Sequence, residues 1–496
     1  MAGKLAGLSS NMNLGQAPVE KVEPSGMNKE TRQRLLRGLA CVAVGALIWN
    51  VPMPAEVQPA AWDLLAVFVA TIAAFILQPL PIGATSLIVL ALLPVLGILK
   101  PGEALQGFSN TTVWLIVAAF MFAEAFIKTG LGTRIAYALL SRFGSNSLNV
   151  AYVMSAADFI IAPFTPSNTA RGGGIIYPII RSVIGAIGAD EGKNRRTAQY
   201  LLFSSYAAVI TSACIFLTGA SNNVLANTLA QETFGMSIGW SDWFLACIVP
   251  GLLLTILTPF LLYKIMNPEL KKTPETQALA KRELQAMGKM SLKEKMLCVI
   301  FLTALVLWAT GSIHGIDSAF VALLGLAAML LTGILEWPDI TKQHGAWDVL
   351  IWMGVLINMA AWLSKLGLMS WFGALVGGYF AGMSWLTMLF GLAVVYVLAH
   401  YFLASNSAHI MALFTTFATV LIAAGAPTLL VLILFAALCN SASFLTHYGC
   451  GVTPIFFGSG LISQVRWWKL GFILAMLHLL VWMGIGMPWM KFLGLF

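Results

Sequence analysis

Long apolar segments separated by short polar stretches fill most of this 496-residue chain. Many of them approach the roughly 20 residues that an α-helix needs to cross a bilayer. They lack the period-2 alternation of transmembrane barrel strands, and helices then satisfy the backbone in lipid. The pattern predicts an all-α polytopic membrane protein with about 11 transmembrane helices. Apolar helices are expected near residues 36–51, 62–78, 83–99, 112–128, 199–229, 243–265, 296–313, 317–335, 347–366, 428–457 and 468–490.

Two apolar regions are too long for one crossing and are polar at their centres. Residues 145–187 contain "FTPSNTARGGG", and residues 371–425 contain "FLASNSAH". A helical hairpin that enters and leaves by the same face would place such a motif near the middle of the membrane. Irregular backbone is tolerated at that depth only beside protein or a water-filled cavity. We therefore predict two re-entrant hairpins whose tips line a cavity.

The two halves of the chain repeat each other. "KTGLG" at 128–132 matches "KLGLM" at 365–369, "SNTAR" at 167–171 matches "SNSAH" at 405–409, and "FLT" occurs at 216–218 and at 444–446. The three matches occur in the same order, and the crossing count starts the two halves on opposite sides. An inverted repeat of this kind is the plan of many secondary transporters.

Charge adds an orientation to this plan. Only 10% of the residues are charged, against roughly 25% in soluble domains. Eleven crossings from a cytoplasmic N-terminus place 24 of the 28 Lys and Arg residues on the cytoplasmic side, as the positive-inside rule requires. The net charge of +8 is explained in this way, and no nucleic-acid partner is expected. The predicted divisions are a cytoplasmic tail 1–34, a first transmembrane helix 35–52, a first inverted repeat 53–265, a cytoplasmic linker 266–295 and a second inverted repeat 296–496.

The polar tips are the candidate binding groups. Each tip supplies hydroxyls and an amide, and the second helix of each hairpin begins there with free N–H groups and a positive dipole end, which suit an anion. A plain helix cap is the structural alternative, since Ser, Asn and Thr cap helices routinely. The tip residues are Ser167, Asn168 and Thr169 in the first repeat and Ser405, Asn406 and Ser407 in the second.

Arg171 and His409 follow the two tips at matching positions. An intramembrane Arg is costly and usually functional, so we expect Arg171 to face the anion as an unpaired charge when the site is empty. His409 is either a second contact or a hydrogen-bonded core imidazole. For the intramembrane acids, we expect Glu124 to pair with Lys128 and Asp158 to pair with Arg181.

Two later helices are also interrupted by polar residues and glycine. Unwound backbone at these breaks would complete a substrate site, whereas close helix packing through small residues is the structural alternative. His447 is either a ligand contact or a packed neutral imidazole. The candidate residues are Thr218, Ser221 and Asn222 in the first break and Thr446 and His447 in the second.

With these motifs in place, the chain resembles the divalent anion/sodium symporter family, in particular its bacterial citrate and tartrate/succinate exchangers and the plastid 2-oxoglutarate/malate translocators. "APFTPSNTARGGGIIYPIIRS" carries the likeness, and "GWSDWFLACIVPG", "ELQAMG" and "GVTPIFFGSG" support it. The resemblance implies two re-entrant hairpins, a homodimer, an elevator movement and binding of substrate carboxylates by both Ser-Asn tips. Sodium-coupled relatives carry neutral residues where this chain has Arg171 and His409, so the resemblance favours Na⁺-independent exchange.

The leading function is exchange of di- or tricarboxylates across a bacterial inner membrane, without a cofactor or metal. Na⁺- or H⁺-coupled symport is the alternative within the same class. An intramembrane enzyme is disfavoured, because the chain has no H-E-x-x-H motif and its intramembrane histidines lack a carboxylate to complete a metal site. A channel would need no inverted hairpins.

Overall fold

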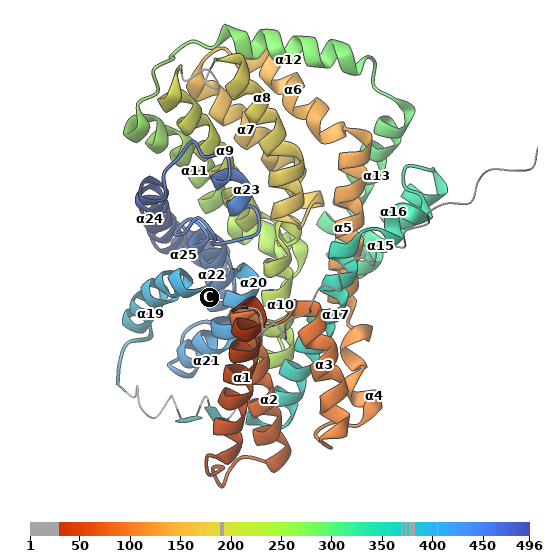
Figure 1. The fold of residues 1–496 in the computed structure, drawn as a ribbon, viewed down its shortest axis with the longest axis vertical. Coiled ribbons are helices and arrows are strands. Elements are labelled where there is room, and N and C mark those ends of the chain that lie inside the picture. The colour runs from red at the N-terminus through yellow and green to blue at the C-terminus, as the bar shows by residue number, and fades with distance from the viewer. Residues whose placement is uncertain (1–28, 189–192, 369–370, 373, 376–381, 404) are drawn as a thin grey trace, which may run out of the picture.

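The computed structural model is all-helical and describes residues 29–188, 193–368, 371–372, 374–375, 382–403 and 405–496 (Figure 1). Most of the expected tail, and residues 376–381 and 404 of the expected second hairpin, lie outside the described residues. Within the described ranges, nine helical segments are long and apolar enough to cross a membrane. They are Pro59–Leu77, Thr111–Thr129, Ser147–Phe164, Arg195–Ile215, Trp240–Met266, His344–Lys365, Trp385–Phe402, Asn406–Ala423 and Gln464–Phe492.

The first half runs from α1 (Lys29–Asn50) to α11. A first hairpin is formed by α7 and α8, joined through a 3₁₀ turn and a π-helix, and a broken helix follows as α9 and α10. After α1, the elements of this half are α2 (Pro59–Leu77), α3 (Ile82–Val95), α4 (Pro101–Ala104), η1 (Gln106–Ser109), α5 (Thr111–Thr129), α6 (Leu131–Phe143), α7 (Ser147–Ile161), η2 (Ala162–Phe164), η3 (Thr169–Ile176), α8 (Tyr177–Ala186), α9 (Arg195–Ile215), η5 (Leu217–Gly219), α10 (Ser221–Phe234) and α11 (Trp240–Met266).

The second half repeats this order after α12. Its hairpin joins α19 to α21 through another 3₁₀ turn and another π-helix, and its broken helix is α22 with α23. The elements are α12 (Pro274–Met287), α13 (Leu292–Ala309), α14 (Gly311–His314), α15 (Ser318–Leu331), α16 (Trp337–Thr341), α17 (His344–Lys365), α19 (Trp385–Ala399), η6 (His400–Phe402), α20 (Asn406–His409), η7 (Ile410–Phe414), α21 (Thr415–Ala423), α22 (Thr428–Ala442), α23 (Thr453–Phe457), α24 (Gln464–Val481), η8 (Trp482–Gly486) and α25 (Met487–Phe492).

The repeat is visible in the backbone hydrogen bonds. Gly97 after α3 and Gly333 after α15 both have left-handed φ, 70° and 65°. In each case the next two N–H groups donate to one carbonyl, that of Leu93 in the first half and that of Met329 in the second. Glycine adopts this conformation without a Cβ penalty, and a four-residue to five-residue helix with proline in its first turn follows each glycine.

The two hairpins point toward each other from opposite ends of the molecule. In Figure 1, α7 and α8 lie in the upper half and α19 and α21 in the lower half, while α10 and α20 lie near the middle. The prediction of an inverted-repeat, all-α fold is confirmed. The count of eleven crossings and the division into domains stay predictions.

Two amphipathic helices, α6 and α12, were not among the predicted elements. They pack against each other at the end of the molecule where α8 lies (Figure 1). Thr276, Leu279 and Ala280 of α12 are buried, and the rest of that helix is largely exposed. Arg134 of α6 also donates to Glu294 at the start of α13 (2.5 Å). The polar linker is therefore a surface helix held against the first repeat.

The predicted pairing of Glu124 with Lys128 is wrong. Lys128 Nζ lies 2.6 Å from a carboxylate oxygen of Asp339 in α16, and Glu124 accepts a hydrogen bond from Gln343 (3.0 Å). Both contacts join α5 to the α16–α17 region of the other repeat. The helix-turn spacing that suggested the pair was outweighed by partners from a neighbouring helix.

Candidate functional site

The first tip is a short irregular segment between η2 and η3. The hydroxyl of Ser167 accepts a hydrogen bond from the N–H of Ala170 (3.1 Å), as a helix cap does. The carbonyl of Pro166 accepts from the N–H of Ser221 (2.7 Å), at the start of α10, and Thr218 donates to Pro163 (2.5 Å). The tip is therefore bound to the first broken helix.

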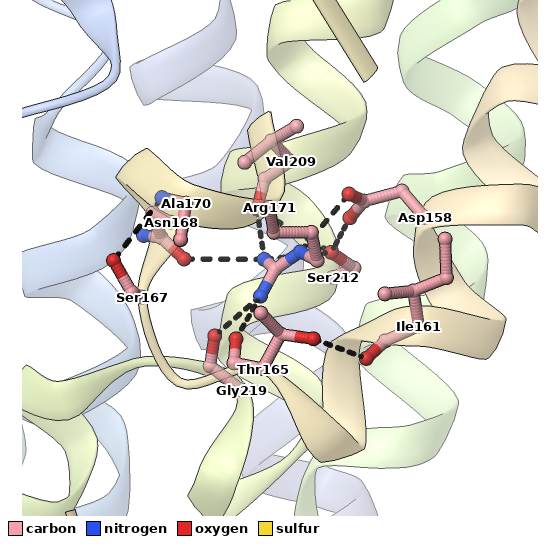
Figure 2. A network of polar contacts seen from close by, with 10 residues as sticks. All are labelled: Asp158, Ile161, Thr165, Ser167, Asn168, Ala170, Arg171, Val209, Ser212 and Gly219. Carbon is pink, nitrogen blue, oxygen red and sulfur yellow. Dashed lines mark hydrogen bonds and ion pairs between the residues drawn. The ribbon is translucent and has the colours of Figure 1, made fainter. Parts of the chain in front are cut away.

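Arg171 lies at the centre of this region and is fully buried (Figure 2). Its Nε donates to Asp158 in the first arm of the hairpin, at 2.9 Å. Nη1 donates to the carbonyls of Thr165 (2.6 Å) and Gly219 (2.9 Å). Nη2 donates to Asn168 Oδ1 and to the carbonyl of Val209, both at 3.1 Å. The second Asp158 oxygen accepts from the Ser212 hydroxyl.

The expectation that Arg171 is an unpaired charge in the empty site is wrong. A guanidinium has five N–H donors, and each has a partner within the protein. Asp158 supplies the opposite charge, so the predicted pair between Asp158 and Arg181 is also wrong. Arg171 contacts the first arm of the hairpin at Asp158 and the turn after it at Thr165. It joins them to the first broken helix through the carbonyls of Val209 and Gly219.

The second tip has a similar cap but a different support. The Ser405 hydroxyl accepts from the N–H of Ala408 (3.5 Å). Asn406 is buried, and its Oδ1 accepts a hydrogen bond from the Ser443 hydroxyl (2.6 Å). Among the described residues, the amide nitrogen of Asn406 has no hydrogen-bond partner. Leaving a buried donor unsatisfied costs about 1–3 kcal/mol, so an acceptor from outside the protein would stabilise this arrangement.

His409, the counterpart of Arg171, is a buried core imidazole bonded to another histidine. Its Nδ1 lies 2.8 Å from Nδ1 of His400. Nε2 of His400 lies 2.7 Å from the carbonyl of Gly449, in the second broken helix. The second repeat therefore uses two side chains to reach the kind of carbonyl that Arg171 reaches alone in the first repeat.

Asparagines from the two broken helices connect the two tips. Asn222 Nδ2 donates to Asn440 Oδ1 (3.2 Å), and Asn440 Nδ2 donates to Asn223 Oδ1 (2.6 Å). All three side chains are buried. Asn440 belongs to α22, and Ser443, the C-cap residue of that helix, donates to Asn406. A continuous set of polar contacts therefore runs from the first tip to the second.

Residues 32–496 match a family model whose description is "Sodium:sulfate symporter transmembrane region". The chain belongs to this family. It is 43% identical to "Putative malate transporter YflS" of Bacillus subtilis, over 94% of this chain and 98% of that protein. It is 40% identical to "Dicarboxylate transporter 1, chloroplastic" of Spinacia oleracea, over 92% of this chain and 81% of that protein. It is 35% identical to "L-tartrate/succinate antiporter" of Escherichia coli, over 92% of this chain and 97% of that protein.

Solved structures are similar in fold at low identity. The Alcanivorax borkumensis YdaH transporter superposes with a TM-score of 0.55 at 14% identity, covering 93% of this chain and 98% of its own. Membership of the divalent anion/sodium symporter family confirms the predicted resemblance. This family member is an integral membrane transporter and not an enzyme.

The remaining candidate residues of this transporter lie at different places around the tips. Thr169 is exposed, and its hydroxyl lies against Gly451 of the second broken helix. Ser407 is half-buried at the second tip, and Thr446 is buried. His447 accepts a hydrogen bond at Nδ1 from Trp468 (3.0 Å) and packs on Phe457. Its imidazole is thus held by the α23–α24 region.

Several residues of this polar network were not predicted from the sequence. Asn223, His400, Asn440 and Ser443 each contact a predicted candidate or a neighbour of one. The signal for two of them was present, because "CNSAS" at 439–443 is a polar run inside the apolar α22. His400 gave no such signal, since a lone histidine at the end of an apolar helix has many explanations.

Proposed function

We propose that this protein is a secondary carrier for di- or tricarboxylates. The two tip asparagines carry this proposal. The oxygen of Asn168 is held by Arg171 and that of Asn406 by Ser443, so each amide is left with its nitrogen as the group that can donate. Carboxylates are acceptor-only groups when ionised. Two amide donors from opposite repeats suit an anion with carboxylates at both ends.

The names of the relatives support the same substrate class. A malate transporter, a chloroplast dicarboxylate transporter and a tartrate/succinate antiporter share 43%, 40% and 35% of their aligned residues with this chain. We assign malate, succinate, tartrate, citrate and 2-oxoglutarate as the candidate substrates, because each carries two or three carboxylates on a short carbon chain.

We further propose obligatory exchange that is independent of Na⁺. In many transporters, carbonyls of broken helices coordinate Na⁺. Here the carbonyls of Thr165, Val209 and Gly219 are bound to the guanidinium of Arg171. This cation is covalently attached and cannot dissociate, so it cannot drive uptake as a co-transported ion would.

The empty carrier should also change conformation more slowly than the loaded one, for a physical reason. Without substrate, closing the site leaves the tip amides without acceptors, at about 1–3 kcal/mol for each unpaired donor. That energy slows the return of the empty site by roughly tenfold per 1.4 kcal/mol. A bound dicarboxylate removes the penalty, and exchange is then faster than net uptake. The inverted hairpins are consistent with an elevator movement of the site, in a homodimer with a cytoplasmic N-terminus in a bacterial inner membrane.

The test is transport by the purified protein in proteoliposomes. We expect labelled succinate or malate to exchange with internal dicarboxylate at the same rate in Na⁺ and in choline, and vesicles without internal substrate to accumulate little label. A panel of the five acids ranks the substrates. Strong stimulation by Na⁺ together with net uptake into empty vesicles would overturn exchange and establish the alternative, a coupled symporter.

Variants of the tips test the binding site. Asn168→Ala and Asn406→Ala should each lower the exchange rate by about tenfold or more, because a substrate carboxylate loses a donor. Asn149→Ala is the control and should exchange normally, because Asn149 lies in the first turn of α7, at the end away from the tip. Wild-type rates in either tip variant would show that the amides do not bind the substrate.

A further inference from the structure

His400 occupies a position where three parts of the second half of the site meet. It ends the first arm of the hairpin in η6, contacts His409 in the second arm and contacts Gly449 in the broken helix. Its side chain is fully buried. If the tip asparagines bind substrate as proposed above, the alignment of these three parts decides where Asn406 points.

We infer that His400 is a positioning residue for the second tip. It holds the end of α20 through His409 and the broken helix through Gly449. The N–H of His409 donates to the carbonyl of Ser405 (3.0 Å), so a fixed His409 also fixes the turn that carries Asn406 and Ser407. His400 itself makes no contact with the substrate.

The first half of the site supports this role by comparison. There Arg171 alone contacts the first arm at Asp158, its own tip at Asn168 and the broken helix at Gly219. His409 matches Arg171 in sequence position, but among the described residues its ring makes no hydrogen bond to the broken helix. His400 makes that contact, so the two imidazoles together replace one guanidinium.

The hydrogen-bond partners assign a tautomer to each imidazole. The carbonyl of Gly449 can only accept, so Nε2 of His400 carries a proton. A neutral His400 then accepts at Nδ1, and Nδ1 of His409 must donate. This leaves Nε2 of His409 without a proton, and that atom has no hydrogen-bond partner among the described residues.

A neutral pair fits the surroundings of the two rings. The repeat offset of 238 residues that relates His409 to Arg171 places Tyr396 where the first half has Asp158. Tyr396 packs edge-on against His409, with ring centroids 4.2 Å apart. An aromatic ring supplies no counter-ion for an imidazolium, and a buried unpaired charge is strongly disfavoured. The second half therefore replaces an ion pair by neutral donors and acceptors in a fixed order.

Nitrogen-15 NMR of histidine-labelled protein tests the tautomers directly. The chain has six histidines, and single His400→Gln and His409→Gln variants assign the two signals. At neutral pH we expect an Nε2–H tautomer for His400 and an Nδ1–H tautomer for His409. Two cationic rings, or the Nε2–H tautomer at both sites, would overturn the inference. This measurement needs no substrate, so its outcome is separate from that of the transport proposal.

Transport kinetics then test the positioning role. His400→Phe keeps a ring of similar bulk but removes both hydrogen bonds, and we expect the KM for succinate to rise by roughly tenfold with a smaller change in kcat. His400→Gln can donate to Gly449 and accept from His409, so it should restore KM most of the way. The control is His344→Ala, an exposed residue at the start of α17.

The variants also distinguish positioning from a general loss of structure. If His400→Phe is poorly folded, the tautomer measurement still tests the ordered contacts of His400, because it is made on wild-type protein and needs no variant that removes both hydrogen bonds. Unchanged KM in both variants, with correct folding, would show that His400 does not position the tip. If wild-type protein exchanges no dicarboxylate at all, the transport proposal fails while the tautomer assignment stands on its own measurement.

Discussion

Arg171 is stable at membrane depth because the protein satisfies all its donors. A charged side chain at the bilayer centre is costly, yet this guanidinium has Asp158 as its counter-ion and five oxygens as further partners. Burying two charges without good geometry costs more than their attraction returns. The buried pair is therefore stable only when both residues are present, because each charge neutralises the other.

Removing one partner of this pair should destabilise the protein strongly. Arg171→Gln leaves the Asp158 carboxylate buried without a counter-ion, and we expect a loss of roughly 3–5 kcal/mol in the free energy of unfolding. Asp158→Asn should also lower the free energy of unfolding, because it leaves the Arg171 guanidinium buried without a counter-ion. The double variant should lose clearly less than the sum of the two single losses, because no unpaired charge remains. Thermal unfolding in detergent of all four proteins measures this, and strictly additive losses would contradict it.

The sequence indicated that Arg171 matters but not what it contacts. Folding the hairpin evenly about Asn168 put Asp158 opposite Arg181. The arms are not even, because η2 is a 3₁₀ turn and η3 is a π-helix. Such segments change the number of residues per turn and thereby shift the pairing along the hairpin. Asn440 and Ser443 were missed for another reason, since contacts between distant helices depend on packing that one sequence does not reveal.

At the scale of elements, the repeat was predictable because glycine marks it. The match between "KTGLG" and "KLGLM" aligns Gly130 with Gly367, and both adopt left-handed φ, 75° and 83°. A side chain at either position would be strained, so these glycines keep the two helix ends alike. The helices α6 and α12 were harder to predict, because a short amphipathic helix has no long apolar run.

Gly451 is a point where the second broken helix meets the first tip. A Cβ placed there would come within 2.4 Å of the Thr169 hydroxyl. Gly451→Ala should therefore rotate Thr169 out of place and reduce exchange by about tenfold, if its hydroxyl bonds the substrate, with little change in the unfolding temperature. Gly391→Ala in α19 is the matched control, because a Cβ there meets nothing within 4 Å. Equal exchange in both variants would argue against a role for this contact.

The start of α9 is stabilised by a carboxylate from the segment after α11. Glu269 accepts hydrogen bonds from the N–H groups of Arg196 (3.0 Å) and Thr197 (2.7 Å). Burial raises the pKa of Glu269, but hydrogen bonds from its own N–H and those of Arg196 and Thr197 outweigh this and lower it to about 2. A negative group at a helix N-terminus also interacts favourably with the helix dipole.

This depressed pKa predicts a pH-dependent contribution to stability. Because the folded-state pKa lies below the ordinary value of 4.5, the contribution is complete at neutral pH and is lost as the pH falls from about 4.5 toward 2. Glu269→Gln should cost about 1 kcal/mol at pH 7, and the difference from wild type should narrow at pH 4 and below. Unfolding temperatures across this range measure it, with Glu275→Gln in α12 as the control. A constant difference at every pH would exclude the carboxylate as the cause.

At the scale of the whole molecule, two half-sites from opposite ends form one polar region. The first tip contacts α10, and the asparagines of α10 contact Asn440 of α22. Ser443, which caps the end of α22, contacts the second tip at Asn406. Because residues of both repeats contribute to this region, neither repeat forms it by itself. An inverted repeat also gives each end of the molecule an equivalent hairpin, which is what alternating access from both sides of a membrane requires.

The distribution of charges predicts an orientation for this molecule in the membrane. With eleven crossings, 24 of the 28 Lys and Arg residues lie on one side, and Lys100, Lys365 and Lys491 lie on the other. Cytoplasmic loops carry such an excess. We therefore expect the segment that contains α12 to be cytoplasmic and the C-terminus to be external.

Single cysteines at two exposed positions test this orientation. Ala286 in α12 and Phe492 near the C-terminus are both exposed. Five of the six native cysteines are buried and Cys298 is partly exposed, so a Cys298→Ser background keeps the native signal low. In intact cells, a membrane-impermeant maleimide should label Phe492→Cys and leave Ala286→Cys unlabelled until the cells are opened. Labelling of Ala286→Cys in intact cells would reverse the orientation, and labelling of both would show that the number of crossings between them is even rather than odd.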